Sequence, residues 1–147
     1  MILDLKAIRR EGKDSQDFFF EYNLDRELSD IPNVSVLPLV KVQGTITLTD
    51  VHQAYIDGQV DFTLAGECTK CLKNSQREYF AIFNEEVFEN NQDGYSVVND
   101  KVDLSKIVID AILVNMPLNF LCSDGCKGIC VGCGVNLNDE ICKCKNK

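Results

Sequence analysis

Polar and apolar residues alternate along three segments in the first 90 residues, the pattern of strands with one buried face. The segments are VKVQGTITLTD (40–50), QVDFTLAGEC (59–68) and REYFAIFNEEVF (77–88). The dipeptide Asp57-Gly58, between the first two, favours a two-residue hairpin turn. Asp17-Phe18-Phe19-Phe20 predicts a further, buried strand. We therefore expect a predominantly antiparallel sheet, curled or barrel-like, because a flat sheet would leave a face and its edges uncovered.

One main helix is predicted at about 103–115. Asp103 can accept hydrogen bonds from the free amides of the first turn, and Pro117 ends the run. Apolar residues at three- and four-residue spacing form a stripe that suits packing on a sheet: Leu104, Ile107, Val108, Ala111 and Ile112. The fold class is therefore α+β, with a β-rich unit over 1–121 and a cysteine-rich segment over 122–147 docked on it.

No segment reads as a membrane span or a signal sequence. The most apolar stretch, IVIDAILVNMPLNFL, is interrupted by Asp110, Asn115 and Pro117. We expect a cytoplasmic protein without membrane contact. Thiols stay reduced in that compartment, so clustered cysteines indicate metal binding or catalysis before disulfides.

Six of the eight cysteines lie in the last 26 residues, and the other two lie in GECTKCLKN. Two residues between Cys130 and Cys133 let both sulfurs face one ion, and Gly134 permits a tight backbone approach behind them. The CKC segment brings two more sulfurs together. The favoured grouping therefore has one site of Cys68, Cys71, Cys122 and Cys126, and a second of Cys130, Cys133, Cys142 and Cys144.

An alternative grouping places Cys122, Cys126, Cys130 and Cys133 on one ion, and pairs Cys142 and Cys144 with Cys68 and Cys71. It ranks second because the CVGCG and CKC segments can share an ion with little loop-closure cost.

Four thiolates around Zn(II) form a closed tetrahedral site with no position for water, so up to two structural zinc ions are expected. The cysteine-rich segment 122–147 has few large apolar side chains, so bound metal must stabilise it in place of a hydrophobic core. An iron–sulfur cluster is the alternative occupant, although CxxC pairs followed by glycine favour zinc. A thioredoxin-like CxxC would open a helix, whereas CTKCLKNSQREYF leads back towards a strand.

Other candidate residues favour structural roles. His52 is the only histidine and is expected at the surface or a sheet edge. Glu85, Glu86 and Glu89 are expected to form a solvated acidic face. No phosphate-binding glycine loop or nucleophile elbow is present. We therefore expect no catalytic residues and no small-molecule substrate.

The net charge of −8 opposes broad contact with nucleic acid. Residues 68–78 and 122–147 nevertheless hold seven basic residues against four acidic ones. The basic residues considered for RNA or partner contact are Lys70, Lys73, Arg77, Lys127, Lys143 and Lys145.

GECTKCL, VDLSKIVIDAILVNMPLNFLC and CKGICVGCGVNLN followed by CKC resemble the YceD family of bacterial large ribosomal RNA subunit accumulation proteins. The family pattern CKGLCPxCGxNLN differs at Ile129 and Val131, which stand where leucine and proline are usual. Some family members keep the first CxxC and lack the final cysteines, which implies two separable sites.

The resemblance implies a non-enzymatic factor in the synthesis, processing or stability of large-subunit ribosomal RNA. Two modes of action are compatible with this role: a small basic surface near the zinc ions contacts RNA, or the chain acts through a ribosome-assembly protein. The negative net charge of the chain favours the protein partner. A zinc-stabilised protein–protein adaptor unrelated to ribosomes and a thiol oxidoreductase are the alternative function classes.

Overall fold

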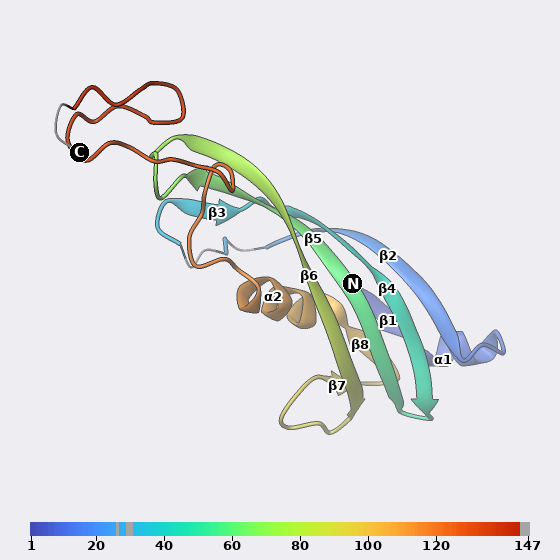
Figure 1. The fold of residues 1–147 in the computed structure, drawn as a ribbon. Helices are drawn as coiled ribbons and strands as arrows, with labels where there is room; N and C mark the ends of the chain where they lie inside the picture. The colour runs from blue at the N-terminus through green and yellow to red at the C-terminus, as the bar shows by residue number, and fades with distance from the viewer. Residues whose placement is uncertain (26, 29–30, 145–147) are drawn as a thin grey trace.

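Four long antiparallel strands form the body of the computed structural model, which describes residues 1–25, 27–28 and 31–144. They are β2 (Ser15–Asn23), β4 (Leu39–Asp50), β5 (Gln53–Glu67) and β6 (Asn74–Glu89). Within the described residues the sheet does not close into a barrel, because β2 pairs with β4 alone at one edge. At the other edge the short strand β7 (Ser96–Val97) runs parallel to the end of β6. The sheet is curved but open (Figure 1).

Shorter elements complete the fold. Strand β3 (Val34–Val36) pairs with the end of β5, and β1 (Ile2–Asp4) pairs with β8 (Lys101–Asp103) in a separate ribbon. The helices are α1 (Leu5–Arg10) and α2 (Leu104–Val114). Neither helix is long and apolar enough to cross a membrane, among the residues described.

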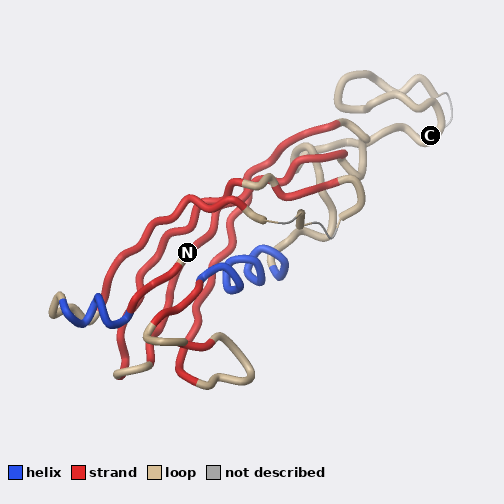
Figure 2. The backbone as a smooth tube through the Cα atoms, turned by 180° about the vertical axis from the view of Figure 1, so that it is seen from behind, coloured by secondary structure: helices blue, strands red, loops and turns tan. Residues whose placement is uncertain are grey.

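One face of the sheet carries the hydrophobic core. Inward residues alternate with outward ones, as the strand patterns predict. Helix α2 covers this face by packing on β5 and β6 (Figures 1 and 2). The Asp103 carboxylate accepts from the backbone amide of Ser105 at 2.9 Å and starts the helix, and the whole predicted stripe from Leu104 to Ile112 is buried. The predicted helix is thus confirmed.

The prediction of a hairpin turn at Asp57-Gly58 is wrong. Strand β5 runs straight through this dipeptide, and the chain turns instead at Val51 and His52. Gly58 lies directly opposite Gly44 of β4. A Cβ at Gly58 would come within 2.6 Å of the Phe83 ring. The glycine therefore makes room for an aromatic ring on the inner face, and does not form a turn.

The strand at Asp17-Phe18-Phe19-Phe20 is confirmed, but only one of its faces is buried. Phe18 lies in the core and its ring covers Gly44, where a Cβ would approach it within 2.8 Å. Phe19 points to the other side of the sheet and is 59% exposed. This difference follows from the pleat, which sends neighbouring side chains to opposite faces.

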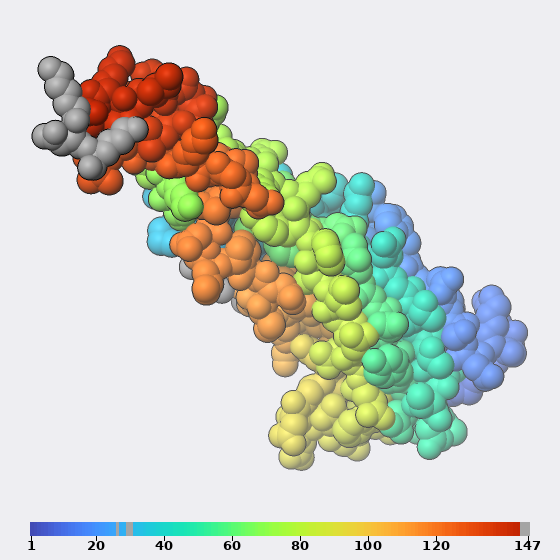
Figure 3. Space-filling model, viewed as in Figure 1, coloured from blue at the N-terminus to red at the C-terminus, as the bar shows by residue number. Residues whose placement is uncertain are grey.

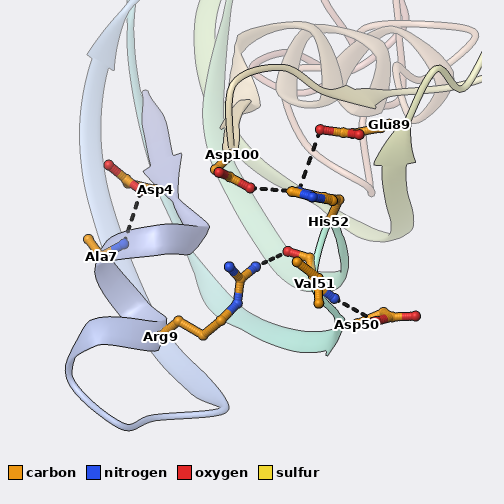
Figure 4. A network of polar contacts seen from close by, with 8 residues as sticks. All are labelled: Asp4, Ala7, Arg9, Asp50, Val51, His52, Glu89 and Asp100. Carbon is orange, nitrogen blue, oxygen red and sulfur yellow. Dashed lines mark hydrogen bonds and ion pairs between the residues drawn. The ribbon is translucent and has the colours of Figure 1, made fainter.

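The tip of the β4–β5 hairpin is fixed by polar contacts (Figure 4). Arg9 of α1 donates to the carbonyl oxygen of Val51. The Nδ1 atom of His52 lies 2.8 Å from Asp100 Oδ1 and 3.5 Å from Glu89 Oε1. His52 is therefore a surface residue, as predicted, and it ties the hairpin tip to the loop before β8.

Candidate metal centres

The eight cysteines form two groups at one end of the elongated molecule, and α1 lies at the other end (Figure 1). In each group the four sulfurs all lie within 4.8 Å of one another. We name them the buried cluster (Cys68, Cys71, Cys122, Cys126) and the terminal cluster (Cys130, Cys133, Cys142, Cys144). The structure groups the sulfurs as in the favoured pairing, and the alternative grouping is not found.

The connection between β5 and β6 presents the first two sulfurs of the buried cluster. The amide of Cys68 donates to the carbonyl of Lys73 at 2.9 Å, and that of Leu72 donates to the carbonyl of Cys68 at 3.0 Å. Leu72 has a φ of 62°, a left-handed conformation that closes the turn. The turn thereby directs the Cys68 and Cys71 side chains to the same point.

The segment after α2 brings the other two sulfurs to this turn. The amide of Thr69 donates to the carbonyl of Phe120 at 2.8 Å, and the Phe120 side chain is fully buried. Arg77 of β6 donates to the carbonyl of Leu121 at 3.2 Å and pairs with Asp124 at 2.9 Å. The Asp124 carboxylate holds the pKa of Arg77 above its ordinary value. These contacts attach the tail to the sheet independently of the sulfurs.

The sulfur separations of the buried cluster fit a tetrahedral ion. Sγ of Cys68 lies 3.7 Å from that of Cys126, and Sγ of Cys71 lies 3.6 Å from that of Cys122. A zinc–sulfur distance of about 2.3 Å places the sulfurs of a tetrahedron about 3.8 Å apart. All eight cysteines are free thiols, so no disulfide competes for them. The residues present therefore suit a four-thiolate metal site.

The terminal cluster is built by a short hairpin-like loop. The amide of Cys130 donates to the carbonyl of Val135, and that of Gly134 donates to the carbonyl of Cys130, both at 2.9 Å. Cys130 Sγ lies 3.3 Å from the sulfur of Cys142 and 3.6 Å from that of Cys144. These separations also lie near the edge of a zinc–thiolate tetrahedron.

Two glycines of this loop have different tasks. Gly134 has a φ of 75°, which a non-glycine residue rarely adopts, but it has no close neighbour. At Gly132 a Cβ would meet the Cys144 sulfur at 2.6 Å. The close approach expected at Gly134 therefore occurs at Gly132, a position that the cysteine spacing does not indicate.

The thiols of the buried cluster differ in pKa. Burial, together with hydrogen bonds among the thiols, raises the pKa of Cys122 to about 12. Burial acts on Cys68 in the same direction, but hydrogen bonds from the backbone at Cys71, Cys122 and Lys70 outweigh it and lower the pKa of Cys68 to about 6. The Cys68 thiol therefore ionises readily, whereas the Cys122 thiol ionises at neutral pH only with a cation nearby.

The terminal cluster shows the same division. The backbone amide of Cys133, and then the Cys142 thiol, lower the pKa of Cys130 to about 6. Hydrogen bonds with Cys130 and Cys133 raise the pKa of Cys144 to about 12. Full ionisation of either cluster thus requires the positive charge that a divalent ion supplies.

Asn138 joins the two clusters. Its side-chain amide donates to the Cys126 sulfur at 3.4 Å, and its Oδ1 accepts from the backbone amide of Lys127 at 2.9 Å. Hydrogen bonding to Asn138 is the main cause of the lowered pKa of Cys126. Cysteine spacing does not point to Asn138, and the NLN triplet shortly after CVGCG is the only sequence signal for it.

The basic residues considered for RNA or partner contact divide into two kinds. Arg77 is occupied by Asp124 and Leu121 and serves as a structural bridge. The exposed lysines are Lys70, Lys73, Lys127 and Lys143, while Lys145 lies outside the described residues.

Known proteins resemble parts of this chain. An uncharacterized protein of Mycobacterium tuberculosis is 32% identical over 95 residues, which cover 58% of this chain and 45% of that protein. A chloroplastic large ribosomal RNA subunit accumulation protein YCED homolog 1 of Zea mays is 36% identical over 52 residues, covering 35% and 18%. Its Arabidopsis thaliana counterpart is 36% identical over 44 residues, covering 30% and 14%. No solved structure matches.

The chain spans about half the length of the mycobacterial relatives that it matches. The family described as Large ribosomal RNA subunit accumulation protein YceD matches residues 56–147, which include β6, α2 and all eight cysteines. Since this match covers more than half of the chain, the protein belongs to the YceD family.

Proposed function

We propose that this chain is a non-enzymatic factor that supports the accumulation of large-subunit ribosomal RNA. The family description and the names of the plant relatives support a ribosome-related role. One observation favours a structural factor over a catalyst: the eight sulfurs form two closed sets of four. Four thiolates around one ion leave no coordination position for a substrate or an activated water.

Zinc is the proposed ion at both clusters. The four sulfurs of each group are close enough for a single ion, and the thiolate set matches the ligands of structural zinc. Zinc would join the segment after α2 to the β5–β6 connection and would order that segment. Three buried side chains meet at this junction: Cys68 and Cys71 from the connection and Cys126 from the segment after α2.

The ordered tail would act through a protein partner. With eight thiolates at −8 and two zinc ions at +4, the formal charge moves from −8 to −12, which opposes contact with RNA phosphates. The four exposed lysines around the clusters provide at most a local RNA contact, because Arg77 is already paired. Ribosome-assembly proteins are therefore the expected partners.

Depletion and complementation test this role. Loss of the protein should lower the level of large-subunit RNA relative to small-subunit RNA, and the wild-type gene should restore it. Cys71→Ser should not restore it, because the buried cluster needs four sulfurs. Ser123→Ala, an exposed change in the same segment, is the matched control. Unchanged RNA levels on depletion would refute the proposal.

Titration of the zinc-loaded chain with large-subunit RNA fragments at several salt concentrations separates direct action, in which the chain binds RNA, from indirect action through a protein partner. Indirect action predicts no saturable binding at low salt. Saturable binding that weakens with salt would show that the lysines contact RNA.

A further inference from the structure

The face of the sheet that points away from α2 exposes large apolar side chains beside carboxylates, although no other element in the described part of the chain packs on it. We propose that this outer face, formed by the outward side chains of β2, β4, β5 and β6, docks an extended Lys/Arg-rich protein segment with alternating apolar side chains. Figure 3 shows these strands side by side across the molecule with no helix over their middle. This docking would operate whether or not the protein acts on ribosomal RNA.

Large apolar side chains stand on this face at defined register positions. Phe80 and Ile82 of β6 are 62% and 58% exposed, and Phe19 of β2 is similarly exposed. Cross-strand pairing places Phe19 and Ile82 at the two ends of one row through Gln43 and Gln59. Four strands at a spacing of about 4.8 Å make this row about 14 Å long, the reach of about four extended residues.

The row is hollowed, which gives apolar side chains a place to enter. A depression of about 520 Å³ extends from Phe19 to Ile82 over Gly44 and Gly58. A second depression of about 640 Å³ lies beside it and is lined by Leu39 and Phe80. Gly44 and Gly58 line this depression with backbone atoms alone, because a Cβ at either position would point to the inner face, where the Phe18 and Phe83 rings lie.

Charge selects the occupant. Among the described residues of these four strands, the outer face carries one basic side chain, Lys41, and six acidic ones. The acidic side chains are Asp17, Glu21, Asp57, Asp61, Glu78 and Glu86. Within the described residues none of these six forms an ion pair. Three accept hydrogen bonds only from neutral groups of the same face: Asp17 from Thr45, Asp61 from Gln59 and Glu86 from Gln53.

The negative charge of the outer face disfavours the other ligands that could cover it. RNA and anionic lipid would bring further negative charge to the carboxylates, and a second copy of the chain would place two acidic faces together. A cationic segment with apolar side chains satisfies both parts of the surface. Its apolar groups would enter the two depressions, and its lysines or arginines would lie over the carboxylates.

The test uses the intact zinc-loaded chain and a fluorescent 12-residue peptide of alternating lysine and leucine. Fluorescence anisotropy measures its dissociation constant, with glutamate replacing lysine in one control peptide and serine replacing leucine in another. We expect saturable binding of the first peptide alone. Ile82→Thr and Asp57→Asn should each weaken it about tenfold, since truncation of a docking side chain commonly has this effect.

Val98→Thr and Asp93→Asn are the matched controls, because both residues are exposed and lie outside the outer face. They should change binding less than twofold. Chemical shifts of the Ile82 methyl groups should move on addition of peptide in the wild-type chain, which locates the contact without any substitution. Absence of saturable binding, equal binding of the glutamate peptide, or unaltered affinity in the outer-face variants would overturn the proposal. Dimerisation abolished by Phe80→Thr would also overturn it, because the face would then join two copies of the chain.

Discussion

The side-chain amide of Asn138 donates a hydrogen bond to the sulfur of Cys126 at 3.4 Å, so a residue of the terminal hairpin stabilises a sulfur of the other cluster. Residues that hydrogen-bond to metal ligands commonly alter metal affinity by about 10–100-fold when they are removed. Asn138→Ala should therefore weaken zinc binding at the buried cluster by about tenfold. Competition with a chromophoric chelator measures this affinity. Asn119→Ala, an exposed change outside both clusters, should leave it unchanged.

The two clusters should lose their ions in a fixed order. Cys68 is fully buried, whereas Cys133 of the terminal cluster is exposed. A chelator should strip the terminal cluster first because its sulfurs are open to solvent, and native mass spectrometry should show a one-zinc intermediate. Thiol alkylation of that intermediate should modify the terminal cysteines and spare Cys68 and Cys71. Simultaneous loss of both ions would show that the clusters are tightly coupled.

Gly132→Ala should disrupt the terminal cluster selectively. The added Cβ would lie 2.6 Å from the Cys144 sulfur, which must move away from its three partners. We expect a zinc content of one ion per chain after mild chelation, with the buried cluster still filled. Gly125→Ala is the control, because a Cβ there meets nothing within 4 Å. Two retained ions in the Gly132 variant would mean that the loop adjusts to the extra methyl group.

Gly58→Ala should destabilise the sheet. The new Cβ would approach both the Phe83 ring and the carbonyl oxygen of Gln43, at 2.6 and 2.7 Å. Overpacking of this kind costs about 1–3 kcal/mol in the free energy of unfolding, which denaturant titration measures. Adding Phe83→Leu should recover only part of the loss, since the backbone contact remains. Full recovery would assign the whole effect to the ring.

The N-terminus of α2 should give stability that depends on pH. The backbone hydrogen bond from Ser105 lowers the pKa of Asp103 below its ordinary value, so the carboxylate stabilises the fold at pH values above its pKa in the unfolded chain. This contribution is lost as the pH falls through the lower pKa of the folded state.

Replacement of the capping carboxylate measures this contribution. Asp103→Ala should lower the free energy of unfolding by about 1 kcal/mol at pH 7, and by less near pH 3. Metal release in acid affects both proteins alike, so the difference between them reports on the cap. A difference that does not shrink in acid would assign the effect to another cause.

Much of the fold follows from short-range patterns. Alternation over 40–50 and 77–88 was enough to predict two strands, and a stripe beginning at Leu104 was enough to predict α2. The error at Asp57-Gly58 arose because the same dipeptide suits a turn and a crowded strand. Its partner residues, Gly44 and Phe83, are distant in sequence, and only the register of three strands brings them together.

For the cysteine clusters, too, some features follow from the sequence and others depend on tertiary contacts. The terminal cluster follows from spacing, because the neighbouring CxxC and CxC pairs can share an ion without closing a long loop, and the buried cluster then follows because its four sulfurs are the ones left over. The roles of Gly132 and Asn138 depend on contacts with Cys144 and Cys126, which spacing does not describe. Helix α1 is six residues long and is fixed by Asp4 and by packing of Leu5 and Ile8, so no periodic pattern predicted it.

The buried cluster also sets an order of events during synthesis. Cys68 precedes Cys126 by 58 residues, which a ribosome needs about 3–12 s to add at about 5–20 residues per second. The β5–β6 turn therefore emerges from the exit tunnel with two unpaired sulfurs, which stay unpaired until Cys122 and Cys126 have also left the tunnel. Nascent chains stalled before Cys122 would hold only half of a binding site, open to oxidants and to any free ion that passes.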